Sequence, residues 1–169
     1  MTFQVGEKVV YPNHGVGTIE NISWRSFGTN AERFYILRLS SSSLTVMLPF
    51  AHAEHVGLRK VTRNGEVAKM LTFLAEGRCE RCRDWKDRFK ENSEKMSKGS
   101  LLEVAEVLKS LVEIQADKPL SFREKKMLDR ARLMLVSELA TSRGLGPDEA
   151  ADTLSKALSK ANLRFPEPL

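Results

Sequence analysis

The sequence predicts a multidomain β plus α protein, in which a small, strongly bent β-barrel is followed by a compact bundle of about five helices. Up to about residue 63, short segments rich in valine, isoleucine and aromatic residues are separated by turn residues, which is typical of strands. After "RNGE" the apolar spacing becomes helical and remains so. We therefore expect a β domain over residues 1–63, a helical domain over 64–162 and an extended tail over 163–169.

The strands of the first part are marked by four segments, "QVGEKVVY", "GVGTIENIS", "RFYILRLS" and "SLTVMLPF". A tight turn is expected between the first two, at "YPNHGVG", because Pro12 fixes φ while Asn13, Gly15 and Gly17 tolerate positive φ. Four or five short strands in about 60 residues favour a small, bent barrel.

Capping signals place the helices of the second part. A first apolar helix is expected to stop near Gly77, and Asp84 is expected to cap a charged helix that follows. "SLLE" at 100–103 and "SFRE" at 121–124 are capping boxes that open two more helices. Pro147 opens the last helix, with two acidic residues after it in the first turn.

Composition indicates a cytoplasmic protein with an anionic partner. The chain has a formal net charge of +5, and its basic excess is concentrated in residues 1–63 and 78–100. No apolar run approaches the roughly 18 residues that a membrane span requires, and the start "MTFQVGEKVV" lacks the pattern of a secretion signal. We therefore expect no membrane association and a cytoplasmic location.

No motif indicates a cofactor, a metal or catalysis. Cys79 and Cys82 form a lone C-x-x-C, and a zinc site would need further ligands, for which only His14, His52 and His55 in the other domain are available as soft donors. A redox pair would need a strand before it, whereas a helical segment precedes this one. Nucleophile-elbow, phosphate-loop and zincin motifs are also missing, so we expect two reduced thiols and no enzyme.

Trp85 has two interpretations. Trp85, Phe89, Asn92 and Met96 fall on one stripe of a helix, which favours a core position. However, a side chain in the first turn can project from a bundle, and a ring among cations suits nucleic acid, where it stacks on bases while the cations neutralise phosphates. The cations concerned are Arg81, Arg83, Lys86, Arg88 and Lys90, and Lys125 and Lys126 could extend the same face. The residues alone leave both interpretations open.

A second aromatic group lies in the β domain. Trp24, Phe27 and Tyr35, together with Arg25, could form a surface patch. Strand alternation usually sends such rings into a small core, so we expect them to be buried.

Six ordered motifs give the sequence a family resemblance. The chain resembles the CarD/CdnL family of bacterial RNA-polymerase-binding transcription regulators from residue 3 to about residue 140. The motifs are "VGEKVVYPNHGVG" from residue 5, "LTVMLP" from 44, "VGLRKV" from 56, "W..R.K.N.EK" from 85, "AEVL..L" from 105 and "LSF.EKKML..AR" from 120.

The resemblance implies a Tudor-like first domain that docks, strand against strand, on the RNA polymerase β subunit. The docking residues implied by the resemblance are Arg25, Leu44, Thr45, Val46, Met47 and Leu48. Some relatives carry a basic residue where this chain has Met47, so the charge of that contact is expected to differ here.

The resemblance also implies that the helical domain contacts promoter DNA. Trp85 matches the family's wedge at the upstream edge of the melted promoter, and the matching basic positions include Arg88, Lys90 and Lys125. Asp87 stands where some relatives are basic, which weakens the expected phosphate contact. We expect a monomer whose DNA contacts are largely independent of sequence. The alternative is a KOW- or Tudor-like adaptor that binds RNA or the ribosome and uses its helices to dock proteins.

Overall fold

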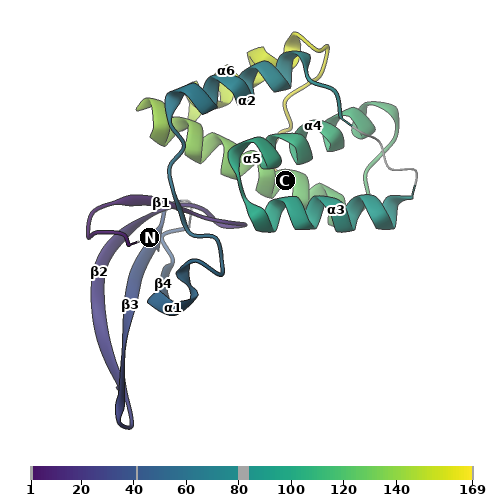
Figure 1. Ribbon diagram of the computed structural model, residues 1–169. Helices are drawn as coiled ribbons and strands as arrows, with labels where there is room; N and C mark the ends of the chain where they lie inside the picture. The colour runs from purple at the N-terminus through teal and green to yellow at the C-terminus, as the bar shows by residue number, and fades with distance from the viewer. Residues whose placement is uncertain (1, 41, 80–83, 169) are drawn as a thin grey trace.

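The computed structural model describes residues 2–40, 42–79 and 84–168, without the side chains of Phe27 and Trp85. Figure 1 shows a sheet followed in the chain by a bundle of helices, which confirms the predicted fold class. The first part contains β1 (Lys8–Tyr11), β2 (Gly15–Phe27), β3 (Asn30–Leu39), β4 (Thr45–Pro49), the short helix α1 (Phe50–Ala53) and β5 (Arg59–Lys60).

The five strands form one antiparallel sheet in the order β4-β3-β2-β1-β5. Along β2, the pairing with β1 covers only residues 15–18, and along β3 the pairing with β4 covers residues 34–38. β2 and β3 continue well beyond these partners, as far as the pair Phe27 and Asn30. The outer half of this hairpin is therefore a two-stranded ribbon that projects from the body of the protein (Figure 1).

Tyr35 organises the core of the sheet. Its ring is 1% exposed and stacks on Phe50 of α1 with a centroid distance of 3.9 Å. Its hydroxyl accepts a hydrogen bond from the backbone N–H of Phe3 at 3.1 Å, so the chain start is attached to the core. The turn between β1 and β2 has the predicted positive φ at Asn13 and Gly15.

The second part is a bundle of α2 (Asn64–Glu76), α3 (Trp85–Lys98), α4 (Leu101–Asp117), α5 (Phe122–Arg143) and α6 (Pro147–Ser159). The predicted caps are confirmed. Ser100 and Ser121 each accept a hydrogen bond from a backbone N–H three residues later at 3.2 Å, and Asp84 accepts one from the N–H of Lys86 at 3.1 Å. Gly99 ends α3 in the left-handed conformation.

The bundle has its own hydrophobic cluster, which is centred on α4 and α5. Residues 163–168 have no regular secondary structure, and Leu163 and Phe165 pack against this cluster. None of the helices described is both long enough and apolar enough to cross a membrane.

The predicted burial of Trp24 is wrong, whereas that of Tyr35 is confirmed. Trp24 is 66% exposed because it pairs with Arg33 in the two-stranded ribbon, where neither β1 nor β4 extends over it. Strand alternation places a ring on one face of a sheet, but burial also requires a layer above that face. The side chain of Phe27 lies outside the part of the chain that the structure describes.

Candidate nucleic-acid interface and docking edge

β4 has one free edge. It stands at the end of the sheet, and within the described residues it pairs only with β3. Along the predicted docking segment, Leu44 and Met47 are 61% and 41% exposed, and Thr45 is also exposed. Val46 is half-buried, and Leu48 belongs to the core of the sheet. The segment therefore offers backbone groups and alternate side chains to a partner, while Leu48 anchors it from behind.

The structure brings Arg25 to this edge. Arg25 lies on β2, and its Nη2 is 3.8 Å from Sδ of Met47 on β4. Both side chains are exposed. On the opposite face of the sheet, the ring of Trp24 lies 5.2 Å from the guanidinium of Arg33, in a cation–π contact. Trp24 is a surface residue that the sequence analysis expected to be buried, since no local pattern shows that β2 extends beyond its neighbouring strands.

α3 begins at Trp85, next to its cap Asp84. Two members of the stripe that begins at Trp85 are buried, Asn92 at 5% and Met96 at 2% exposure, and Phe89 is half-buried. The Trp85 side chain lies outside the described residues, as do Arg81 and Arg83. Its assignment as a wedge therefore stays a prediction.

Arg88 joins the start of α3 to the start of α5. Its Nε and Nη2 donate to the two carboxylate oxygens of Glu124 at 2.8 and 3.0 Å. The two side chains are 11% and 4% exposed. A bidentate pair so shielded from water fixes the two helices in register. Arg88 is thus oriented toward protein, unlike the exposed Lys86, Lys90, Lys125 and Lys126.

Four predicted cations are free to meet a ligand from solvent: Lys86 and Lys90 on α3, and Lys125 and Lys126 on α5 are all exposed. The Nζ of Lys126 lies 4.7 Å from the ring centroid of Phe122, which is itself 65% exposed. Phe122 is a second exposed aromatic residue that the sequence analysis missed. Its place at the first helical position, outside the buried stripe of α5, was the available signal.

A groove of about 420 Å³ lies between α3 and α5, next to Phe122 and Lys126. Its apolar lining includes Phe89, Met96, Phe122 and Met127, and its basic lining includes Arg123, Lys126 and Arg130. The guanidinium of Arg123 lies 4.4 Å from the Phe89 ring centroid. Cations next to flat rings suit a ligand that presents both phosphates and bases.

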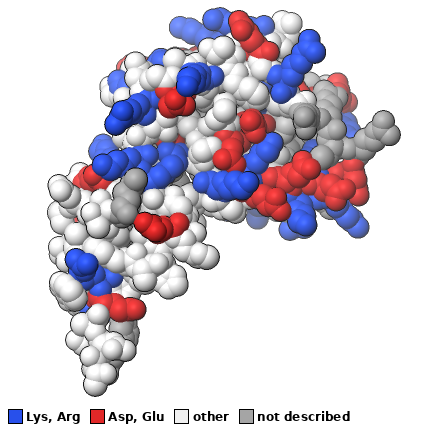
Figure 2. All heavy atoms as spheres, viewed as in Figure 1, with Lys and Arg blue, Asp and Glu red and all other residues white. Residues whose placement is uncertain are grey.

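Basic and acidic side chains are interspersed over the helical part in the view of Figure 2. Acidic side chains gather at the lower right of that view, where Figure 1 shows α3, and no continuous basic field is seen, so attraction of phosphates must come from local groups of cations. The outer end of the hairpin carries few charges in the same view.

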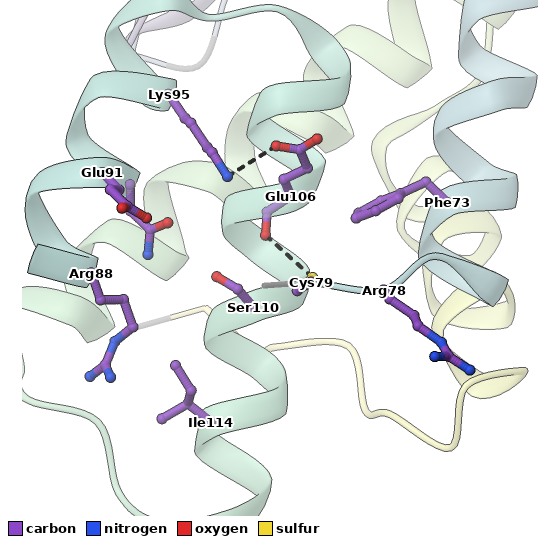
Figure 3. A pocket seen from close by; sticks show the side chains of 10 residues that line it. Phe73, Arg78, Cys79, Arg88, Glu91, Lys95, Glu106, Ser110 and Ile114 are labelled. Carbon is purple, nitrogen blue, oxygen red and sulfur yellow. Dashed lines mark hydrogen bonds and ion pairs between the residues drawn. The ribbon is translucent and has the colours of Figure 1, made fainter. Parts of the chain in front are cut away.

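A second cavity, of about 300 Å³, lies between α3 and α4 (Figure 3). Its lining includes Arg88, the ion pair between Lys95 and Glu106 at 3.1 Å, and Cys79. Burial, followed by the nearby carboxylate of Glu113, raises the pKa of the Cys79 thiol to about 11. The thiol therefore stays protonated at neutral pH. Cys82 lies outside the described residues, which contain no cluster of three metal-ligating side chains.

Comparison with known proteins covers both parts of the chain. Residues 3–62 match the "CarD-like/TRCF RID domain" and residues 69–155 match "CarD, C-terminal domain". A Bacillus subtilis (strain 168) protein described as "Putative transcription factor YdeB" is 36% identical over 143 residues, which are 85% of this chain and 94% of that protein. On these matches, the chain belongs to the CarD/CdnL family of bacterial transcription regulators.

Proposed function

We propose that this regulator docks on the RNA polymerase β subunit and stabilises the open promoter complex by wedging Trp85 at the upstream edge of the bubble. The observation that carries the docking half is the uncovered edge of β4, next to the exposed Arg25. The DNA half is supported by the start of α3 at Trp85 and by the exposed lysines around it.

Docking uses the backbone of β4. A partner strand that adds to this edge satisfies the unpaired N–H and C=O groups, and the exposed side chains of Leu44 and Met47 supply specificity. Arg25 adds a cation beside Met47. Because Met47 is neutral where some relatives carry a basic residue, Arg25 is the main cationic contact at this edge.

The wedge acts by discriminating between two promoter states. Unstacking base pairs at the fork costs a few kcal/mol per step, and stacking of a base on an aromatic ring is worth roughly 1–3 kcal/mol. Only the open complex presents an unstacked step to Trp85. Each 1.4 kcal/mol of such differential binding shifts the equilibrium toward the open complex by about tenfold.

The exposed lysines hold the wedge against the backbone of the DNA. Lys86, Lys90, Lys125 and Lys126 contact phosphates, largely independently of sequence. Arg88 acts indirectly, since its guanidinium is bonded to Glu124 and holds α3 against α5. Tethering to polymerase raises the effective concentration of these weak contacts at the fork.

The wedge is tested with Trp85→Ala in a reconstituted transcription reaction. We expect the variant to bind polymerase as the parent does but to shorten the half-life of the open complex about tenfold, because the stacking contact is lost. Trp85→Phe is the matched control and should retain part of the effect, since it keeps a ring. A large drop in melting temperature together with an unchanged open-complex half-life would show that the ring belongs to the core.

The docking edge is tested with Arg25→Glu. We expect at least a tenfold weaker affinity for polymerase, because the change replaces an attractive charge at the edge by a repulsive one. Lys8→Glu makes the same change of charge on an exposed residue of β1, and it should leave the affinity within twofold of the parent. Binding of Arg25→Glu at parental affinity would remove Arg25 from the interface. Purification of the tagged chain with ribosomes and without polymerase would favour the adaptor alternative.

A further inference from the structure

The sheet and the bundle meet at a junction where polar contacts lie beside buried apolar side chains, including Val10 of β1 and Val16 of β2, which belong to neither hydrophobic cluster. Only three residues connect the end of β5 at Lys60 to the start of α2 at Asn64. The hydrophobic cluster of the sheet contains no residue beyond Leu58, and the cluster of the bundle contains none before Val67. No single hydrophobic cluster spans the two parts, so their relative orientation is set by the contacts at the junction, which combine the packing of β2 on α5 and of Pro12 on Gly99 with polar contacts.

An ion pair between Arg59 of β5 and Glu138 of α5 lies at the centre of the junction. Nη1 and Nη2 of Arg59 donate to the two carboxylate oxygens of Glu138 at 2.7 and 2.6 Å. The Glu138 side chain is 3% exposed and that of Arg59 is 23% exposed. A bidentate pair of this kind constrains both the distance and the angle between the elements that carry it.

Surrounding groups complete the contact. The backbone N–H of Thr62 donates to Glu138 at 2.9 Å, and Ser142 Oγ donates to the carbonyl of Thr62 at 2.6 Å. The carbonyl of Gly99 accepts from Nε and Nη2 of Arg59 at 3.0 and 2.7 Å. We call Arg59, Thr62, Gly99, Glu138 and Ser142 the junction clamp.

The junction clamp holds α3 at the end opposite Trp85. Gly99 ends α3, and Arg59 binds its carbonyl directly. α3 has 14 residues, which makes it roughly 21 Å long. A rotation of about 10° at the Gly99 end would therefore move the Trp85 end by roughly 4 Å. A displacement of that size is enough to break a stacking contact between two rings.

We propose that Arg59 and Glu138 are positioning residues, which hold the sheet and the bundle in one orientation so that docking of β4 delivers the start of α3 to the promoter fork. This inference rests on the function proposed above. A fixed orientation excludes the arrangements in which α3 misses the fork, and so raises its effective concentration there.

The orientation is measured first, by the distance distribution between two nitroxide labels. The labels are attached at His52→Cys on α1 and Asp152→Cys on α6, two exposed positions in different parts of the chain, after Cys79 and Cys82 are replaced by serine. We expect one narrow distribution in this parent and a clearly broader one when Glu138→Gln is added, because one of the two acceptor oxygens facing the guanidinium is then replaced by an NH2 group, which can only donate.

The consequence is then measured as the half-life of the open complex. Arg59→Lys keeps the positive charge but loses the guanidinium group that makes two parallel hydrogen bonds to Glu138. We expect it to shorten the half-life at least threefold while polymerase affinity stays within twofold of the parent. Arg132→Lys is the matched control. It replaces the guanidinium of a partly buried arginine that pairs with Asp129 within α5 and not across the junction. The half-life and the polymerase affinity should therefore both stay parental.

A crosslink separates positioning from general loss of stability. Asn13 Nδ2 lies 3.4 Å from Ser97 Oγ across the junction, so Asn13→Cys and Ser97→Cys can be joined by a short thiol reagent. In the chain without Cys79 and Cys82 that carries Glu138→Gln and no label sites, this crosslink should restore the half-life of the open complex.

The inference is overturned if the label distances stay narrow in both variants, or if they broaden while the half-life stays parental. Failure of the crosslink to restore the half-life also overturns it. If the parent itself does not prolong the open complex, the proposed function fails as well, and the label distances then show separately whether the clamp fixes the orientation.

Discussion

Cys79 shows how its surroundings determine the chemistry of a single side chain. A cysteine in a C-x-x-C pair among basic residues could be a reactive thiolate, since cations lower a thiol pKa. Here burial outweighs Lys95 and Lys109, and the carboxylate of Glu113 acts in the same direction, so the pKa rises to about 11. The thiol also donates a weak hydrogen bond to the carbonyl of Glu106. Cys79 is thus a half-buried, unreactive group.

This pKa shift predicts slow labelling of Cys79. Because the thiolate is the nucleophile, raising the pKa from 9.0 to about 11 should slow reaction with a disulfide reagent at pH 8 by roughly a hundredfold. The measurement uses Cys82→Ser, so that one thiol remains. The control is a chain with Ser97→Cys as its only cysteine, at an exposed position. Equal rates for the two chains at pH 8 would contradict the shift.

The same shift has a defined effect on stability. Above about pH 9 the unfolded chain releases its thiol proton, whereas the folded chain retains it until about pH 11. The unfolded state therefore binds fewer protons in this window, and the folded state loses stability as the pH rises through it. Below pH 9 both states keep the proton, and Cys79 adds no pH dependence.

At the scale of the helices, most boundaries follow from local chemistry. Capping boxes, the left-handed Gly99 and Pro147 at the first position of α6 were readable because each satisfies or removes a backbone group of its own helix. The end of α2 is different. It has no basic residue in its last turn, and the backbone N–H of Gly77 donates to the carbonyl of Phe73. A further cap comes from another helix.

Lys109 of α4 supplies that cap. It is 2% exposed, and its Nζ donates to the carbonyls of Phe73 and Gly77 at 3.0 and 2.6 Å. The ammonium also lies 5.3 Å from the Phe73 ring centroid. Charge counting treats such a lysine as a solvated surface residue. Only the packing of α4 against α2 shows that its cation neutralises the negative end of a helix.

Lys109→Met is therefore expected to destabilise the fold. The substitution keeps the aliphatic bulk but removes the donor to the partly buried carbonyl of Gly77, which should cost about 2 kcal/mol. Urea unfolding should show a lower midpoint with an unchanged slope. Lys160→Met, at an exposed position after α6, should leave the midpoint unchanged. A midpoint for Lys109→Met equal to that of the control would show that water replaces the ammonium.

For the whole molecule, the division into strands and helices was predictable because each part has its own period and its own core. The placement of one part against the other was not, since it depends on side chains far apart in sequence. Arg59 and Glu138 are 79 residues apart. Arg59 lies in the motif "VGLRKV", but no local pattern indicates that Glu138 is its partner. The same reason explains why the bond between Arg88 and Glu124, 36 residues further along the chain, was not predicted.

In the candidate interfaces, too, some features follow from the pattern of the sequence and others depend on tertiary contacts. The free edge of β4 follows from strand order, and the exposed lysines follow from helix periodicity. Trp24 and Phe122 were missed because their exposure depends on where neighbouring elements end. Sequence therefore identifies the chemical groups of this regulator well, whereas tertiary contacts decide which of them face solvent.

The ribbon formed by the outer halves of β2 and β3 has a mechanical consequence. Two strands without a third strand or a layer beneath them twist and bend more readily than a packed sheet. Near β1 and β4, in contrast, the same hairpin is braced on both sides. The tip of the hairpin can therefore bend to fit the surface of an uneven partner. Its base, which is paired on both sides, resists bending and so keeps the partner at a fixed position relative to the bundle.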